Sequence, residues 1–324
     1  MYKKFVPFAV FLFLFFVSFQ MMENPYTLDY IGAMKKDAVT VTASKDPLYE
    51  ELLQKAPQYE VKAQNARIDQ IWKSIPGYNG LKVNIKKSYE QMKKNGEFQE
   101  NDLVYEQVKP KIHLDSLPPE PIYKGHPDKP MVAFLINVAW GNEYLEKMLP
   151  VLQQHHVKAT FFLEGNWVKN NPQLAKKIAN EGHEIGNHSY NHPDMSKLTT
   201  GRISEQLDKT NEQIEKTLDI KPKWFAPPSG SFRKAVVDIA SEKGMGTVMW
   251  TVDTIDWQKP APSVLQTRVI SKIHNGAMIL MHPTDPTSQS LEALITKIKE
   301  KGYSLGTVTE LMDETRLVKQ QRLR

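Results

Sequence analysis

Three histidines in the second half of the chain stand where they could bind a metal ion or transfer protons. His188 and His192 are four residues apart, and Pro193 stops any helix there, so we expect the pair on a loop. Two imidazoles, one oxygen ligand and a water would make an open zinc-type site, whereas solvated loop histidines are the plainer interpretation. His282 directly follows an apolar run and is a candidate general acid. Spacing alone leaves both interpretations of these histidines open.

Carboxylates stand at comparable positions. Asp253 and Asp256 follow another apolar run, and either could hold His282 in one tautomer by accepting its ring N–H. Loop capping is the alternative for both aspartates. Glu164 ends a further apolar run, and Asn137 ends the first one. Residues suited to contact a sugar ring, or simply to pack at a rim, occur in the same segments: Tyr190, Pro228, Ser229 and Trp257.

Strand-like and helix-like patterns alternate from residue 131 onward. The predicted strands are Met131–Asn137, Ala159–Leu163, Glu184–His188, Trp224–Ala226, Gly246–Val252, Ala277–Met281 and Ser304–Val308. The predicted helices are Asn142–His155, Pro172–Asn180, Ile203–Leu218, Ala235–Lys243, Val264–Ile273 and Leu291–Lys301. This alternation indicates an α/β fold of parallel β/α units, in a sheet covered on both faces or closed into a barrel. Chemistry is then expected at the carboxyl ends of the strands, where the polar residues named above gather.

The chain before this region has a different pattern. We expect a tether and a small α+β domain over residues 23–113, in which Ala66–Trp72 reads as a short helix. Five prolines in residues 114–130 predict a stiff linker, and residues 131–315 then form the main domain. Residues 316–324 form a basic tail.

The first 22 residues predict export. Lys3 and Lys4 precede the uncharged segment Phe5–Met22, which as a helix would be about 27 Å long, close to the thickness of a bilayer core. The lysines would stay in the cytoplasm and the rest of the chain would lie outside. The segment lacks a small-x-small cleavage site, which favours a membrane anchor over a cleaved signal peptide. We expect a membrane protein whose bulk is extracytoplasmic, with secretion after cleavage as the alternative.

Composition excludes several classes of protein. The chain has no cysteine, which excludes a disulfide scaffold, a thiol nucleophile and cysteine-ligated zinc. The net charge of +5 is spread over 42 basic and 37 acidic residues, unlike the dense basic stripe of a nucleic-acid-binding protein. The charge is compatible with anionic polymers of a cell envelope.

Residues 131 to about 315 resemble the polysaccharide deacetylase family, the NodB homology domain of carbohydrate esterase family 4. The segments that carry the resemblance occur in the family's order: Lys158–Phe162, Glu181–Ser189, His192–Pro193, Pro227–Gly230, Asp253–Trp257 and Leu280–Pro283. The chain as a whole resembles a membrane-anchored, sporulation-associated subgroup of this family. The resemblance implies a distorted barrel of about seven β/α units and metal-dependent N-deacetylation of an N-acetylated glycan such as peptidoglycan.

The resemblance also implies roles for individual residues. A divalent, zinc-like metal would be bound by an aspartate and two histidines, here His188 and His192. His282 matches the general acid, and Asp256, with Asp253 as the second choice, matches the carboxylate that tunes it. The family's two adjacent aspartates, base and metal ligand, correspond here to Asn137 and Val138.

Asn137 cannot accept a proton and Val138 cannot bind a metal. An arginine of the family is replaced by Ala226. Two functions follow from these departures. The chain is either an envelope deacetylase with an altered mechanism, in which Glu164 replaces the missing carboxylate, or an inactive protein that binds glycan or scaffolds other wall-remodelling proteins.

Overall fold

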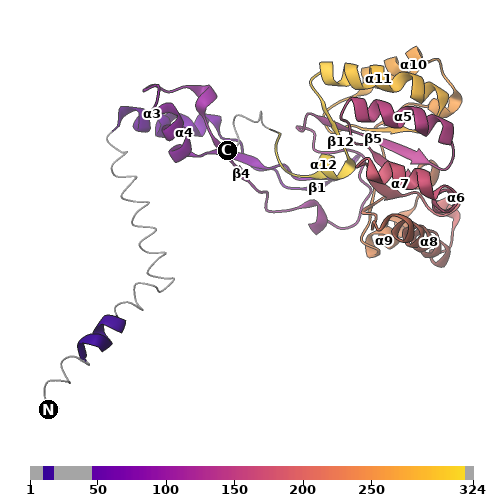
Figure 1. Ribbon diagram of the computed structural model, residues 1–324, viewed down its shortest axis with the longest axis horizontal. Coiled ribbons are helices and arrows are strands. Elements are labelled where there is room, and N and C mark those ends of the chain that lie inside the picture. The colour runs from indigo at the N-terminus through magenta and orange to yellow at the C-terminus, as the bar shows by residue number, and fades with distance from the viewer. Residues whose placement is uncertain (1–9, 18–45, 318–324) are drawn as a thin grey trace. The chain divides into compact units, whose positions relative to one another are not determined.

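The computed structural model describes residues 10–17 and 46–317, and these residues beyond 45 form two compact units (Figure 1). One unit contains residues 46–60 and 82–106, and the other contains residues 61–81 and 107–317. The predicted small domain of residues 23–113 therefore has residues in both units. Two strands, β3 (Gly80–Val83) and β4 (Tyr105–Val108), each span a point where the chain passes from one unit to the other.

The smaller unit is built on two helices, α3 (Pro47–Lys55) and α4 (Ile85–Met92). The side chain of Asp46 caps α3 by accepting the N–H of Leu48 at 2.9 Å. Its other oxygen accepts the hydroxyl of Tyr89 in α4 at 2.7 Å, which ties the two helices together. Leu52 and Met92 are fully buried in this unit.

A hairpin replaces the predicted helix Ala66–Trp72, so that prediction was wrong. Strands β1 (Arg67–Asp69) and β2 (Lys73–Ile75) pair antiparallel. The carboxylate of Asp69 accepts the N–H groups of Ile71 and Trp72 at 2.9 and 2.8 Å, which forms the turn. An aspartate that binds the backbone two residues on favours a turn over a helix.

Within the described residues, the larger unit has an eight-stranded sheet in which every named pairing is parallel. Its strands are β5 (Met131–Val138), β6 (Thr160–Leu163), β7 (Glu184–Asn187), β8 (Trp224–Phe225), β9 (Gly246–Thr247), β10 (Val252–Asp253), β11 (Met278–Met281) and β12 (Ser304–Gly306). The order is β10-β11-β5-β6-β7-β8-β9, and β12 pairs with the first residues of β5. The strands at the two ends of this order are not paired with each other, so the sheet is a curled half-barrel, consistent with the expected distorted barrel of β/α units.

Helices cover the outer face of this sheet. They are α5 (Asn142–Gln154), α6 (Gly165–Asn170), α7 (Pro172–Asn180), α8 (Thr200–Leu218), α9 (Lys234–Glu242), α10 (Pro262–Lys272) and α11 (Asp285–Glu300). The short α12 (Val308–Met312) instead packs on the inner side, where Val308, Leu311 and Met312 contact the inner core. Figure 1 shows α5, α10 and α11 together on one side of the sheet, and α8 beside α9.

Two predicted strands have different bounds in the structure. The predicted strand Gly246–Val252 is two short strands, β9 and β10, which lie at opposite ends of the sheet. The predicted strand Ser304–Val308 ends at Gly306, because Thr307 caps α12 by accepting the N–H of Glu310 while the Glu310 carboxylate accepts the N–H of Thr307.

The central strand β5 separates two apolar cores. All eight of its residues are buried. Val132, Phe134, Ile136 and Val138 pack under the outer helices, whereas Met131, Ala133 and Leu135 face the inner, concave side. Successive side chains of a strand point to opposite faces, so this alternation decides which side each residue at the end of β5 can reach.

The proline-rich segment packs against the larger unit. The N–H of Ile122 donates to Thr247 at 2.9 Å and its carbonyl accepts from Met249 at 2.8 Å, so the segment extends the sheet beyond β9. Gly125 is bonded to Gly276. Prolines lack the donor that a central strand needs but are tolerated along such an edge.

The predicted membrane segment lies largely outside the described residues. Residues 10–17 are helical, and no helix among the described residues is long and apolar enough to span a bilayer. The predicted tether and the end of the basic tail also fall outside them. The anchor therefore stays a prediction.

Three buried histidines should make the stability of the larger unit depend on pH. Burial lowers the pKa of His126 and of His183 to about 4, and that of His188 to about 3. In the unfolded chain these rings are protonated below about pH 6.5. Because the unfolded state binds more protons between these pKa values, the free energy of unfolding is at its full value above about pH 6.5 and falls as the pH drops toward 4.

Urea unfolding at pH 7.5 and pH 5 measures this loss, which should reach a few kcal/mol at about 1.4 kcal/mol per pKa unit. The substitution His183→Gln should make the loss smaller. His156→Asn, at an exposed site with a left-handed backbone that asparagine tolerates, is the matched control and should leave the loss unchanged. An equal loss in all three proteins would contradict this account.

Candidate functional site

Strand alternation brings His282 and Asn137 to the inner face of the sheet. Along β11, Met278 faces the inner core, so His282 is on the same face four residues later. Along β5, Asn137 follows the inner residues Ala133 and Leu135. Because Ile136 is paired with Met281, the register places Asn137 beside His282 at the carboxyl end of the sheet.

The predicted histidine pair is present and is held as neutral rings. His188 is 1% exposed, and its Nδ1 is 2.7 Å from the carbonyl oxygen of Ala226. A carbonyl only accepts, so Nδ1 carries the proton and Nε2 keeps its lone pair. The ring of His192 lies 5.0 Å away at an angle of 70°. Burial, and then the neighbouring His192, lower the pKa of His188, and burial also lowers the pKa of His192.

His282 is fixed by Asp256. The carboxylate of Asp256 is fully buried. It accepts one hydrogen bond from Nδ1 of the His282 ring at 2.8 Å and another from the His282 backbone N–H at 2.6 Å. The hydroxyl of Thr287, in the first turn of α11, donates to the same carboxylate at 2.7 Å. Of the two candidate aspartates, the structure therefore pairs Asp256 with His282. Asp253 instead accepts the N–H of Ile255 at 2.8 Å, which is the capping role considered for it.

Aromatic side chains flank the histidines. Trp140 was missed by the sequence analysis and is 49% exposed, and its ring is stacked on His282 at 6.1 Å and 8°. It follows the first strand, so its position at the rim could have indicated it. Trp257, predicted to contact substrate, is 57% exposed next to Asp256. The Trp140 ring, which is stacked on His282, and the more exposed Trp257 ring both suit contact with the apolar face of a sugar.

Of the other predicted substrate contacts, Ser229 is exposed, whereas Tyr190 and Pro228 are less accessible. The ring of Tyr190 packs so closely on Gly165 that a Cβ there would lie 2.6 Å from it. Pro228 is buried, and Ser229 has a left-handed backbone with φ of 53° in the loop that follows β8. All three residues lie in the predicted loops. Packing is a sufficient reason for a ring at Tyr190 and for the buried Pro228, which matches the alternative of rim packing.

Asn137 has an unused acceptor at the site. Its side chain is nearly buried, and its Oδ1 has no hydrogen-bond partner among the described residues. A buried amide oxygen without a partner costs about 1–3 kcal/mol, so a ligand or a water is the expected donor.

Val138 points the other way. It is fully buried in the outer core beneath the helices, on the face opposite to the histidines. The residue at the position of the family's metal-binding aspartate is thus both apolar and directed away from the histidine pair.

Glu164 does not form a three-ligand group with the histidine pair in the part of the chain that the structure describes. It stands at the N-terminus of α6, where burial raises the pKa of its carboxyl group and the backbone N–H of Trp167 lowers it. Among the described residues, no three histidine, aspartate or glutamate side chains are grouped so that they could hold a metal ion. The residues present supply two imidazoles and do not fit the family's three-ligand metal.

Comparisons with known proteins agree with this fold and site. The polysaccharide deacetylase family profile matches residues 124–248. The YlxY protein of Bacillus subtilis is 86% identical over 98% of this chain and 100% of its own length. The peptidoglycan-N-acetylmuramic acid deacetylase PdaA of Bacillus subtilis is 33% identical, covering 59% of this chain and 75% of PdaA. The chain belongs to the polysaccharide deacetylase family.

A solved structure matches the larger part of the chain. It is BA3943 from Bacillus anthracis, described as a carbohydrate esterase family 4 pseudoenzyme, with a TM-score of 0.80, 56% identity and coverage of 83% of this chain and 96% of that one. A mutant of that protein, described as having restored enzymatic activity, gives a TM-score of 0.80 at 54% identity, with coverage of 83% and 99%.

Replacing the buried aspartate should separate the two candidate carboxylates. Asp256→Ala leaves three donors without an acceptor and should lower the free energy of unfolding by about 3 kcal/mol. The matched control Asp253→Ala removes one local turn contact and should cost less than about 1 kcal/mol. Urea unfolding at pH 7.5 measures both. Equal losses would mean that Asp256 does not hold His282 as described.

Proposed function

We propose that this protein is a member of the polysaccharide deacetylase family that binds a cell-wall glycan without hydrolysing it. The observation that carries the proposal is the end of β5, where Val138 is buried in the outer core and Asn137 stands in place of a base. A missing general base alone typically lowers the rate by about 10²- to 10⁴-fold. The pseudoenzyme neighbour supports the proposal.

The remaining groups can recognise an N-acetylated sugar without a metal. The Nε2 lone pair of His188 accepts hydrogen bonds, and the amide of Asn137 can both donate and accept. These are the groups that an acetamido N–H and carbonyl would need. The exposed rings of Trp140 and Trp257 offer apolar faces for the sugar. Peptidoglycan is the proposed glycan because relatives such as PdaA are peptidoglycan deacetylases.

The same proposal includes a place in the cell. We infer from the segment Phe5–Met22 that the chain is anchored in the membrane by its N-terminus, with both compact units outside the cytoplasm. A role in sporulation is part of this proposal and rests on the subgroup that the chain resembles. Glycan and membrane are the proposed partners, and no nucleic acid is expected.

A second candidate function is deacetylation by an altered mechanism. It is favoured by the three intact contacts of the Asp256 carboxylate, with the His282 ring, the His282 backbone N–H and the Thr287 hydroxyl, an arrangement that suits His282 as a general acid. The same three contacts also satisfy a buried carboxylate, so the fold itself has a reason to keep them. For this reason we place binding first.

Glycan binding should not depend on a metal. A soluble peptidoglycan fragment should bind equally well with and without EDTA, measured by calorimetry on the full chain. Trp140→Ala should weaken binding about tenfold, as for a stacked aromatic at a binding site, whereas Trp72→Ala, outside the histidine site, should not. Loss of binding in EDTA would overturn the metal-free mode.

Hydrolysis should respond to position 137 and not to position 138. Asn137→Asp places a carboxylate on the inner face beside His282 and should produce measurable acetate release from the same fragment. Val138→Asp is the matched control. It buries a carboxylate in the outer core, so it should destabilise the chain by several kcal/mol and release no acetate. Acetate release by the unaltered chain at a comparable rate would favour the second candidate function.

A further inference from the structure

A cavity lies at the end of the sheet opposite to the histidines. It has a volume of about 900 Å³ and is lined within the larger unit by residues of the proline-rich segment, α9 and the segment after α12. Trp224 and Gly246, which line it, are the first residues of β8 and β9, so the cavity stands at the amino ends of these strands. His188 and His282 follow the carboxyl ends of β7 and β11. The two places are therefore separated by the length of the strands.

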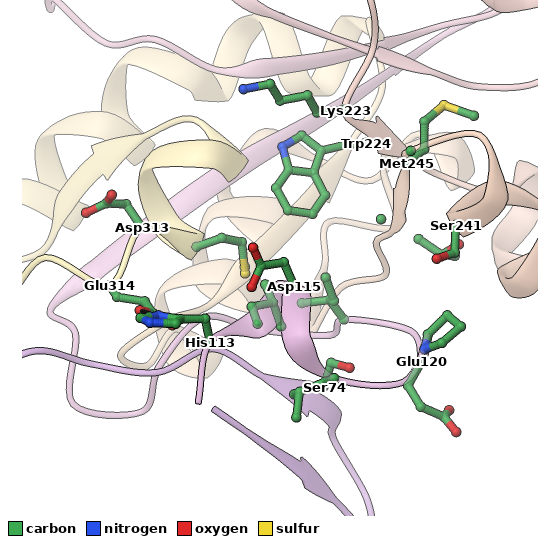
Figure 2. A pocket seen from close by; sticks show the side chains of 18 of the residues that line it. Ser74, His113, Asp115, Glu120, Lys223, Trp224, Ser241, Met245, Asp313 and Glu314 are labelled. Atoms are coloured by element: carbon green, nitrogen blue, oxygen red, sulfur yellow. Dashed lines mark hydrogen bonds and ion pairs between the residues drawn. The ribbon is translucent and has the colours of Figure 1, made fainter. Parts of the chain in front are cut away.

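One wall is an indole held in a fixed orientation. The Trp224 ring nitrogen donates to the hydroxyl of Thr309 at 2.8 Å, so its polar group is already satisfied. The six-membered part of the ring lies on Gly246, where a Cβ would be 2.5 Å from Cζ3. Figure 2 shows the ring on one side of the cavity, with Asp115 and Glu120 of the proline-rich segment across from it. Such a ring is a flat apolar surface that needs no reorganisation before a ligand stacks on it.

The facing wall is also rigid. Leu114, Pro118 and Pro119 line it, and the segment is tied to the sheet through the 2.9 Å hydrogen bond from Ile122 to Thr247. Proline fixes its own φ, so little conformational entropy remains to be lost when a ligand enters.

Two buried polar atoms of the lining residues have no partner. Thr247 is 2% exposed and Asn79 is 6% exposed, and neither the Oγ1 of Thr247 nor the Oδ1 of Asn79 has a hydrogen-bond partner in the described part of the chain. Each such group costs about 1–3 kcal/mol unless it is satisfied. A hydroxyl and an amide oxygen at one cavity call for a ligand that can donate and accept hydrogen bonds.

Charges around the cavity exclude a strongly charged ligand. Asp115, Glu120 and Asp313 would repel an anion, and Lys109 and Lys223 would repel a cation. Neither lysine has an ion pair within 4.0 Å among the described residues. A neutral ligand with many hydroxyl groups can satisfy both signs at once, because each hydroxyl donates and accepts.

We propose that this cavity is a second saccharide site, in which a neutral pyranose stacks on Trp224 and its polar groups bond Thr247, Asn79 and Asp115. This proposal does not depend on the proposed function of the histidine site. With both sites filled, one chain would hold two glycan segments, one at each end of its sheet, which is the behaviour expected of a cross-linking protein.

Fluorine NMR can observe the two sites separately. The full chain, with its six tryptophans replaced by 5-fluorotryptophan, is titrated with a soluble β-1,4-linked tetramer of N-acetylglucosamine. Single Trp→Phe substitutions assign the resonances. Trp224 reports the cavity, and Trp140 and Trp257 report the histidine site. The proposal predicts a saturable shift of the Trp224 resonance.

Variants show whether that shift comes from the cavity. Trp224→Leu removes the ring and should abolish binding there, but it also touches the inner core, so Asp115→Ala on the exposed segment is the second variant. Asp115→Ala should weaken the Trp224 response several-fold, whereas Glu292→Ala, on α11 and outside the cavity, and His188→Ala should leave it unchanged.

Each outcome decides between the two sites. A shift of Trp224 alone supports the cavity and removes the proposed function of the histidine site. A shift of Trp140 and Trp257 alone overturns the cavity proposal and leaves that function intact. A Trp224 shift abolished by His188→Ala, or produced by the cationic peptide Ala-Lys-Ala in place of the saccharide, also overturns the cavity proposal.

Discussion

The alternation of side chains at the end of β5 decides the chemistry of this protein. Residues 131–138 form a fully buried strand between two apolar cores, and its last two side chains point to opposite faces. Asn137 faces the histidines, and Val138 packs under the helices. A carboxylate at position 138 would have to leave the outer core or be buried there without a partner, which costs several kcal/mol. The apolar residue thus fits the packing of the fold, and it leaves the histidine pair with no third ligand among the described residues.

The retained histidines have structural reasons to remain. His188 donates to Ala226 and so links the end of β7 to the residue after β8. Asp256 is fully buried, and its contacts with His282 and Thr287 link the loop after β10 to the start of α11. Removing one member of such a network leaves a buried charge or donor unsatisfied. Histidines that match a catalytic motif are therefore weak evidence for catalysis here. The amide oxygen of Asn137, which has no partner among the described residues, is better evidence for a ligand.

Much of the fold could be predicted from the sequence because its signals are local. The apolar run of β5 and the 3.6-residue period of α8 lie within a few residues of their predicted bounds. The helix predicted at Ala66–Trp72 failed because a single side chain, Asp69, turns the chain there. The predicted strand Gly246–Val252 is divided into β9 and β10 because the two pieces pair with different neighbouring strands. The hydrophobic pattern of the sequence does not contain that information.

The sequence predicted most of the residues of the candidate site, but it did not predict which of them contact one another. Asp253 and Asp256 follow the same apolar run, so only the three-dimensional course of the loop could select Asp256. Trp140 and Thr287 belong to no motif. Trp140 contacts His282 from a loop that precedes β11 in the sequence, and Thr287 contacts Asp256 from a helix that follows it. The alternation of side chains along Met131–Val138 could have predicted that Val138 points outward. It could not have predicted how much apolar packing surrounds Val138.

Metal content is the most direct test of the central claim. The purified full chain is incubated with zinc, freed of excess metal and analysed for its elements, alongside the double variant His188→Ala/His192→Ala. This account predicts no stoichiometric zinc in either protein, since two neutral imidazoles without a carboxylate do not complete the site. One zinc ion per chain that is lost in the double variant would contradict it, and would show that another side chain supplies the third ligand.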